Sequence, residues 1–316
     1  MDKKFRHLKS GLTPPYGSLF YTWDLTYDCN YACSYCSLGY EEERARKPKT
    51  LILPPEEWGK IWEDIYKKYG PAHIHLTGGE PFTYPGIMEI IGKFIKYHTF
   101  ESSTNLSWEP DELIRRVPAG RARLGTSFHP EMEELNIFLN KAEKLVRAGF
   151  EVWSNYVAYP PFLKDLPGAK KAFKEIGINM SILPFNGRYG DSDYPAAYDE
   201  EERVFLRELG ADLPWVKKSM DFAFEKKPAE KKSFKSRKCW MGAVYAKIHP
   251  DGRVFRCCAE GGMYLGNITD KTMGLLDSPQ LCALENCPCW KAMAIGNENV
   301  WVEHWPFPPE AGEIIE

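Results

Sequence analysis

The segment FYTWDLTYDCNYACSYC (residues 20–36) determines how the rest of the chain is interpreted. Its first eight residues are rich in aromatic and β-branched side chains, which is typical of a β-strand. The strand leads directly into a loop with three cysteines, Cys29, Cys33 and Cys36. Their number is odd, so they cannot all form disulfides, and they are too close together to link distant parts of a fold. The spacing instead indicates a metal site in which three protein ligands leave one position open.

Two other metal sites use similar spacings. A structural zinc site takes four Cys or His ligands, and His73 or His75 could supply the fourth. A ferredoxin cluster takes four cysteines. The three-cysteine loop, however, follows a predicted strand of an α/β fold, and such folds bind their ligands at the carboxyl ends of the strands. That position favours a catalytic centre.

Composition excludes several classes of protein. The chain has 316 residues and a net charge of −3, and its pI of about 6.2 argues against a general nucleic-acid binder. It contains neither a signal peptide nor an apolar run of about 18 residues, so we expect a soluble cytoplasmic protein without a membrane partner. In a reducing compartment, nine cysteines indicate metal ligation. They fall into two groups, at 29–36 and 239–289, which favours two sites over unrelated buried thiols.

From about residue 20 to 210, strand-like and helix-like segments alternate. This pattern predicts about six βα units with a parallel sheet. Handedness and closure rules turn six such units into a curved, partial (β/α)6 barrel of the TIM type, and the two further units of a complete barrel are hard to find. The expected strands are 20–27, 73–81 with its turn, 100–105, 123–128, 150–159 and 179–186, and the expected helices are 54–70, 86–98, 110–117, 132–149 and 168–177.

The remaining residues divide into three parts. Residues 1–19 are expected to form an N-terminal extension, and residues 211–238 a Lys-rich linker, with a patch for an acidic partner as the alternative. Residues 239–316 would form a small second domain and tail. Within it, AVYAKIHPDGRVFRCC (residues 243–258) predicts a β-hairpin, since PDG is a strong turn signal. The tail, with Trp301 and Trp305, is expected to pack against the body of the protein.

The cysteine loop resembles the cluster motif of the radical SAM superfamily, with Tyr35 as the aromatic residue before the third cysteine. The resemblance implies that Cys29, Cys33 and Cys36 hold a [4Fe–4S] cluster whose open iron binds S-adenosylmethionine (SAM). An electron from a donor such as flavodoxin or ferredoxin would then cleave SAM to methionine and a 5′-deoxyadenosyl radical, which takes hydrogen from the substrate. Tyr35 would belong to the cofactor site.

A second motif, TGGEP, follows the predicted second strand at residues 77–81. Without a family it is a weak signal, because a plain βα turn with a capping acid would look the same. The resemblance assigns Gly78, Gly79 and Glu80 to the amino group of SAM. It also suggests further strand-end residues, each of which has an alternative as an ordinary strand-end polar group or helix cap. These are Ser103, Asn105, Ser127 and Asn155 for the cofactor and Arg188 for the substrate.

The second cysteine group has the pattern C-x12-G-x4-C, from Cys239 to Cys257. It resembles the start of the SPASM/twitch extension of radical SAM enzymes, a β-hairpin and helix that hold auxiliary clusters. Six cysteines are too few for two such clusters, so we expect one auxiliary [4Fe–4S] cluster, with zinc on the same thiols as the alternative. The closing segment CALENCPCW departs from the usual pattern. The expected ligands are Cys239, Cys257, Cys287 and Cys289, with Cys282 in reserve. Cys258 is left over, either as a buried spectator or as a hydrogen donor to a substrate radical.

Three functions follow from these motifs. The first is a radical SAM enzyme that modifies a peptide or protein by cross-linking, epimerisation or oxidation, the commonest role in the extended subfamily. The second is a radical SAM dehydrogenase or epimerase of a sugar or other small metabolite. The core begins by about residue 20, with no peptide-recognition domain expected before it, which mildly disfavours leader-dependent peptide maturases and leaves room for this second function, although the first is preferred. The third, a non-catalytic zinc or iron–sulfur interaction protein, explains the cysteines but not TGGEP. RNA modification is disfavoured by the acidic pI.

Overall fold

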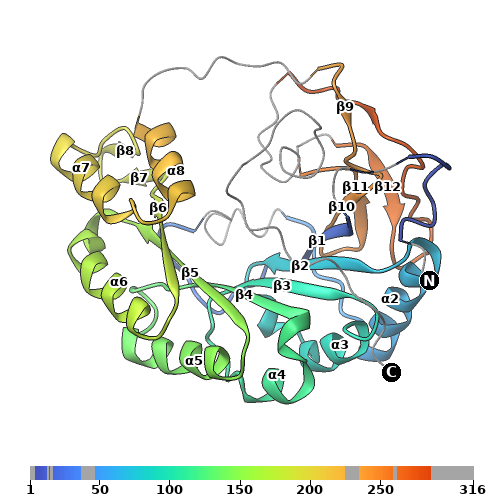
Figure 1. Ribbon diagram of the computed structural model, residues 1–316, viewed down its shortest axis with the longest axis horizontal. Coiled ribbons are helices and arrows are strands. Elements are labelled where there is room, and N and C mark those ends of the chain that lie inside the picture. Colours follow the sequence, from blue (N-terminus) through green and yellow to red (C-terminus); the bar gives the residue numbers. More distant parts are fainter. Residues whose placement is uncertain are drawn as a thin grey trace.

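A curved sheet forms the centre of the protein. The computed structural model describes residues 4–12, 14, 17–36, 47–224, 235–258 and 262–285. Six parallel strands lie in chain order, each beside the next, as the alternating sequence predicts. The expected partial barrel is therefore confirmed (Figure 1). The strands are β1 (Leu19–Thr26), β2 (Ala72–Gly78), β3 (Thr99–Thr104), β4 (Ala122–Ser127), β5 (Glu151–Ala158) and β6 (Asn179–Pro184).

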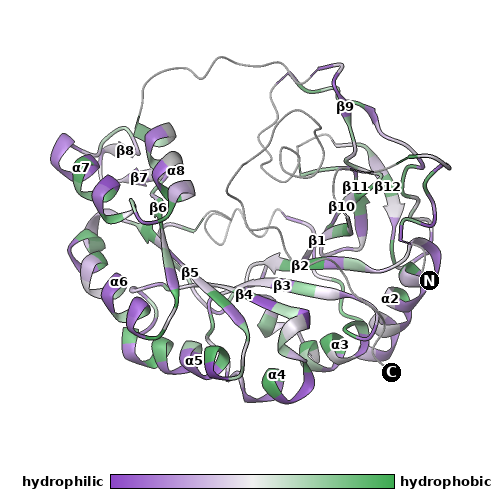
Figure 2. Cartoon of the chain, in the orientation of Figure 1, coloured by the Kyte–Doolittle hydropathy of each residue, from purple (hydrophilic) through white to green (hydrophobic). Residues whose placement is uncertain are grey.

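Helices cover the outer face of this sheet. Figure 1 shows α2 to α6 along that face, and Figure 2 shows that these helices are apolar on one side and hydrophilic on the other. The helices are α2 (Pro55–Tyr69), α3 (Ile87–Phe94), α4 (Asp111–Arg116), α5 (Leu135–Arg147), α6 (Leu166–Glu175), α7 (Glu200–Leu209) and α8 (Pro214–Phe224). Short 3-10 helices η1 (Pro81–Thr83), η2 (Ala119–Arg121) and η3 (Pro160–Asp165) lie between them.

An aromatic cluster fixes α2 to the first strand. Trp58 and Trp62 are four residues apart, so they lie on the same face of the helix, and both are buried. Their ring centroids lie 4.7 and 5.1 Å from that of Trp23 on β1. Burying a large apolar side chain contributes about 1.5–3 kcal/mol. The outward residues of β1 therefore belong to the core, and alternate residues of the strand face the concave side.

Part of the predicted linker is wrong, because α8 (Pro214–Phe224) lies inside residues 211–238. Val216, Met220 and Phe224 are four residues apart and buried, and they pack in the main core. This apolar stripe outweighs the Lys-rich composition that follows it. Residues 225–234 lie outside the described part of the chain.

The predicted hairpin is confirmed, but its place in the sheet was not foreseen. Strands β10 (Tyr245–Ile248) and β11 (Arg253–Phe255) are antiparallel, and β12 (Tyr264–Asn267) pairs with β11. Strand β10 also lies parallel to β1, with Phe20 opposite Tyr245, so these C-terminal strands extend the core sheet. Within residues 235–258 and 262–285 no helix follows the hairpin.

Two small sheets complete the described structure. Strand β9 (Lys238–Cys239) pairs with β13 (Gln280–Leu281), and β7 (Gly187–Tyr189) with β8 (Ser192–Tyr194). None of the helices in the described ranges is both long and apolar enough to cross a membrane.

Candidate active site

The base of the cysteine loop is bonded to the TGGEP turn. The Gly79 amide donates to the Thr26 carbonyl at 2.8 Å, and the Glu80 amide donates to the Asp28 carbonyl at 2.9 Å. A Cβ at Gly79 would clash with the Asp28 backbone. Gly78 has a φ of +129°, and a Cβ there would clash with Thr26. The two glycines are therefore required by the close approach of the two motifs to each other.

The three thiols of the loop suit a positively charged metal centre. Cys33 is 9% exposed, and burial, followed by the charges of Cys36 and Cys29, raises its pKa to about 12. The charges of the two neighbouring thiolates add a smaller repulsion to the effect of burial. Bound iron would relieve that repulsion, since thiolate is the ligating form. Among the residues that the structure describes, no group of three or more His, Cys, Asp or Glu side chains is arranged so that it could hold a metal ion.

The loop between β4 and α5 supports the cysteine loop, a role that no motif in the sequence predicts. Glu131 accepts hydrogen bonds from the Ser34 amide at 2.9 Å and the Ser34 hydroxyl at 2.6 Å. Glu133 accepts from the Tyr31 hydroxyl at 2.9 Å and from Lys141 at 2.7 Å. In the sequence these acids resemble those that commonly precede a helix. The only hint of another role is that several of them lie close together before α5.

Tyr35 is fixed by aromatic neighbours from two strand ends. Its hydroxyl lies 3.1 Å from Nδ1 of His129, and its ring centroid lies 4.9 Å from that of Tyr159. Burial lowers the pKa of His129 to about 4, so this ring is neutral at pH 7. Tyr35 therefore stands in a rigid aromatic group beside the cysteine loop. Its contact with the cofactor stays a prediction.

Glu80 is almost fully buried and binds three protein donors. One oxygen, Oε1, accepts from the Phe82 amide at 3.1 Å and from the Thr104 hydroxyl at 2.8 Å. The other, Oε2, accepts from the Asn105 amide at 2.6 Å. Burial raises the pKa of Glu80 to about 7, although these hydrogen bonds act in the opposite direction. A carboxylate offers about four acceptor positions. Glu80 thus caps η1 and joins β3 to the turn, and these three donors leave one of its roughly four acceptor positions unused.

We expect Glu80→Gln to weaken SAM binding about tenfold or more while the cluster spectrum persists. The physical reason is the loss of a charge-assisted hydrogen bond, which is worth about 1.5–3 kcal/mol. Because the pKa of Glu80 is about 7, SAM affinity of the wild-type protein should increase as the pH rises through that value and the carboxylate ionises. Equilibrium binding of SAM to the anaerobic, reconstituted protein measures both effects. Equal affinity in the variant and the wild type would leave Glu80 with the capping role alone.

The other predicted cofactor residues lie in different places. Asn105 is 5% exposed. Its side-chain nitrogen Nδ2 lies 3.0 Å from Oδ1 of Asn30 and 3.8 Å from the Cys29 sulfur. Ser103 lies 2.9 Å from Nε2 of His75. Ser127 and Asn155 are opposite each other on β4 and β5. The structure therefore brings Asn105 to the cysteine loop. Arg188, the candidate substrate residue, has a 69% exposed side chain on β7.

A cluster of buried and half-buried polar side chains, with one carboxylate and one guanidinium at its centre, occupies the concave face of the sheet. Glu101 on β3 lies 3.6 Å from His73, 3.8 Å from His75 and 4.0 Å from Arg123. Arg123 also pairs with Glu151 at 2.5 Å. The spacing of the two histidines by two residues places them on one face of β2. The spacing of the two histidines can be read from the sequence. Their partners on β3, β4 and β5 cannot, because they become neighbours only in the folded sheet.

The C-terminal thiols come from three separate segments. Cys239 lies on β9 opposite Gln280 of β13, and the Cys282 amide donates to the Arg237 carbonyl at 2.8 Å. Cys257 and Cys282 pack against the small apolar cluster that contains Cys239. Burial raises the pKa of Cys239. Thiolates from three segments suit a metal that would hold these segments together. Cys282, the reserve ligand, thus joins the group, while Cys287 and Cys289 lie outside the described residues.

Cys258 is exposed, so the buried spectator role is wrong. Its sulfur lies 2.9 Å from the Tyr245 hydroxyl, which donates to the Thr22 hydroxyl at 2.9 Å. Thr22 belongs to the concave face of β1, because its neighbours Tyr21 and Trp23 face the helices. The hydrogen-donor role of Cys258 stays a prediction.

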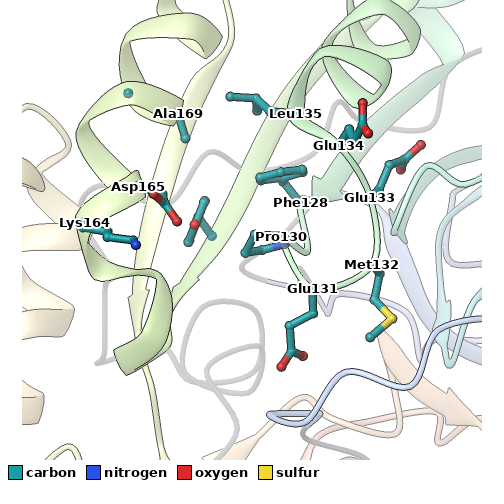
Figure 3. A pocket seen from close by; sticks show the side chains of 12 residues that line it. Phe128, Pro130, Glu131, Met132, Glu133, Glu134, Leu135, Lys164, Asp165 and Ala169 are labelled. Atoms are coloured by element: carbon teal, nitrogen blue, oxygen red, sulfur yellow. The ribbon is translucent and has the colours of Figure 1, made fainter.

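A cavity of about 750 Å³ lies next to the β4–α5 loop (Figure 3). Its lining includes Phe128 and Tyr156, whose rings pack against each other, and the ring of Phe128 also packs with Phe138 and Phe173 in the layer of helices. Figure 3 shows Lys164, Asp165 and Ala169 on one side and Glu131 to Leu135 on the other. The cavity therefore lies between the β4–α5 loop and the segment of η3 and α6, and its lining includes Glu131, which binds the cysteine loop.

Residues 23–166 match the Radical SAM superfamily. They begin in β1 and include the cysteine loop, the TGGEP turn and strands β2 to β5. These residues therefore form a radical SAM domain, and the resemblance drawn from CNYACSYC and TGGEP is confirmed.

Several curated relatives align with the chain. GTP 3′,8-cyclase of Aquifex aeolicus is 27% identical over 78% of this chain and 84% of its own length. PqqA peptide cyclase of Granulibacter bethesdensis is 27% identical over 57% of this chain and 50% of its own length. The sporulation killing factor maturation protein SkfB of Bacillus subtilis is 25% identical over 97% and 76%.

Solved structures share the fold. Streptococcus suis SuiB bound to the precursor peptide SuiA has a TM-score of 0.52 and 14% identity, covering 81% of this chain and 63% of that one. Native anSMEcpe with bound AdoMet has a TM-score of 0.53 and 13% identity, covering 80% and 78%. At these identities the likeness concerns the fold alone.

Proposed function

We propose that this radical SAM enzyme modifies a peptide or protein by cross-linking, epimerisation or oxidation. The observation that carries the proposal is the similarity to PqqA peptide cyclase, which extends over 57% of the chain. The likeness in fold to SuiB, solved with a precursor peptide, is consistent with it. A second group of thiols on the edge of the core sheet adds support, because auxiliary clusters accompany such modifications in related enzymes.

The residues of the chain have distinct roles in this proposal. Cys29, Cys33 and Cys36 hold the [4Fe–4S] cluster, which when bound supplies the electron that cleaves SAM to a 5′-deoxyadenosyl radical. The remaining acceptor position of Glu80 receives the amino group of SAM. The β4–α5 loop holds the cysteine loop in place through Glu131. A flavodoxin or ferredoxin provides the electron.

The second thiol group belongs to an auxiliary [4Fe–4S] site in residues 239–316. The radical SAM core starts at about residue 20, after an N-terminal extension. We place the enzyme in the cytoplasm, where reducing conditions preserve thiolate ligands.

A small polar metabolite is the second candidate substrate. Alignment with GTP 3′,8-cyclase extends over 84% of that relative, a larger share than for PqqA peptide cyclase. The polar cluster around Glu101 on the concave face also offers hydrogen-bonding groups to a polar molecule.

Substrate-dependent 5′-deoxyadenosine formation distinguishes the two candidates. The reconstituted full chain would be incubated anaerobically with SAM, a reductant, and either the peptides encoded beside its gene or GTP. We expect one of the peptides to stimulate 5′-deoxyadenosine formation and to change in mass by the loss of two hydrogen atoms, or to gain deuterium from D2O if it is epimerised. Stimulation by GTP together with unmodified peptides would reject the peptide proposal in favour of the small-molecule one.

A further inference from the structure

We propose that Arg256 positions the C-terminal cysteines and raises the reduction potential of the cluster bound by them. The proposal rests on the auxiliary cluster proposed above. Arg256 directly precedes Cys257 and is 9% exposed. No motif in the sequence singles it out.

The guanidinium of Arg256 joins the segments that carry the other two cysteines. On the first segment, it donates to the carbonyl of Met241 at 2.8 Å and to that of Cys239 at 3.3 Å. On the second, it donates to the carbonyls of Gln280 at 2.9 Å and Leu281 at 3.2 Å. One planar group thus fixes the backbone at Cys239 and at the residue before Cys282. Lysine could not reproduce this arrangement, because an ammonium group lacks the rigid fork of five donors.

The turn around Arg256 is shaped to admit its side chain. Gly242 has a φ of +91°, and a Cβ there would lie 2.8 Å from Cγ of Arg256 and 2.8 Å from Cδ1 of Leu276. The Gly242 carbonyl accepts from the Leu276 amide at 2.9 Å. Glycine at this position therefore lets the chain close over the stem of the arginine. The backbone at Gly242 therefore leaves space for the Arg256 side chain that another residue at this position would fill.

The positive charge of Arg256 lacks a carboxylate partner among the described residues. All four of its hydrogen bonds go to backbone carbonyls, and none of the ion pairs in the described part of the chain includes it. A cluster with several thiolates is anionic and becomes more so when it accepts an electron. A nearby fixed cation stabilises the reduced state more than the oxidised state, which raises the potential.

The test uses the whole 316-residue chain with Cys29, Cys33 and Cys36 changed to Ala, so that only the auxiliary cluster titrates. In this background we compare Arg256→Gln, Arg256→Lys and Arg253→Gln. Arg253 is the matched control, because it lies three residues away and carries the same charge but pairs with Asp251 at 2.6 Å. Anaerobic redox titration of iron-loaded protein gives the potential, and thermal unfolding of the iron-free protein reports on positioning.

We expect Arg256→Gln to lower the equilibrium constant for one-electron reduction about tenfold, which is about 59 mV. Arg256→Lys should keep most of the potential, because the charge remains, but both variants should lower the unfolding temperature of the iron-free protein, since the fork is lost. Arg253→Gln should change neither quantity.

The two proposals fail in different ways. If the background protein binds no iron, the auxiliary cluster is wrong, whatever the role of Arg256. If it binds iron and Arg256→Gln has the same potential as Arg253→Gln, the inference about Arg256 is wrong and the cluster stands. If Arg256→Gln cannot be loaded with iron, the reduction potential of Arg256→Lys tests the electrostatic role instead. If the equilibrium constant for reduction falls about tenfold in Arg256→Lys, which retains the charge, the electrostatic role is rejected.

Discussion

Replacing Cys29, Cys33 and Cys36 together with Ala is expected to reduce 5′-deoxyadenosine formation to background. The three thiols are the only protein ligands that the proposed mechanism gives to the SAM cluster, so their loss removes the source of the electron. Iron should remain only at the C-terminal site. Iron and sulfide analysis of the anaerobically reconstituted protein, with chromatography of the SAM products, measures both outcomes.

The structure supplies a check that the triple variant is folded. The loop is held through Ser34 and Tyr31 by Glu131 and Glu133, and these contacts do not involve the thiols. Circular dichroism and thermal unfolding of the iron-free protein should therefore resemble those of the wild type. Undiminished SAM cleavage by a folded triple variant would contradict the assignment of the cysteine loop.

Changing both Cys239 and Cys257 to Ala is expected to lower the iron content by about four per chain, as befits a [4Fe–4S] cluster held by cysteine thiolates. SAM should still be cleaved, but without coupling to product. The variant should also unfold at a lower temperature than the loaded wild type, because the metal joins segments that are distant in the chain. This variant and the triple variant are reciprocal controls, since each should retain the iron that the other loses.

Cys282 extends this test. The structure places it with Cys239 and Cys257, so Cys282→Ala is expected to lose the same iron. If this variant retains all the iron, Cys282 is not a ligand, and Cys287 and Cys289 are the remaining ligands as first predicted. If the reconstituted wild type contains about four irons and a zinc, the C-terminal site is a zinc site, and a role as electron acceptor falls with it.

The sequence was sufficient wherever the signal is local. The aromatic and β-branched residues of 20–27 predict a strand that the structure contains as Leu19–Thr26. The turn at Asp251 and Gly252 predicts the hairpin, which forms between β10 and β11. Strand–helix alternation and handedness are properties of neighbouring segments, and together they predict the partial barrel.

Local signals also have limits. Val216, Met220 and Phe224 form an apolar stripe that favours a helix. The Lys-rich residues that follow them led to the prediction of a linker instead. Glu131 looks like an acid before a helix until its partner Ser34 is known. Cys258 looks like one more buried thiol, yet it is exposed next to Tyr245.

The sequence by itself determined the motifs from which we predict the chemistry of the protein: a three-cysteine loop after a strand, a Gly-Gly-Glu turn after the next strand, and a second group of thiols. Only the tertiary structure decided which distant segments meet. It placed β10 beside β1, more than two hundred residues earlier, and it brought Arg256 between the segments of Cys239 and Cys282. The backbone donors and acceptors at a strand edge are the same whatever the side chains are. Their partner strand is therefore set by the packing of the whole chain.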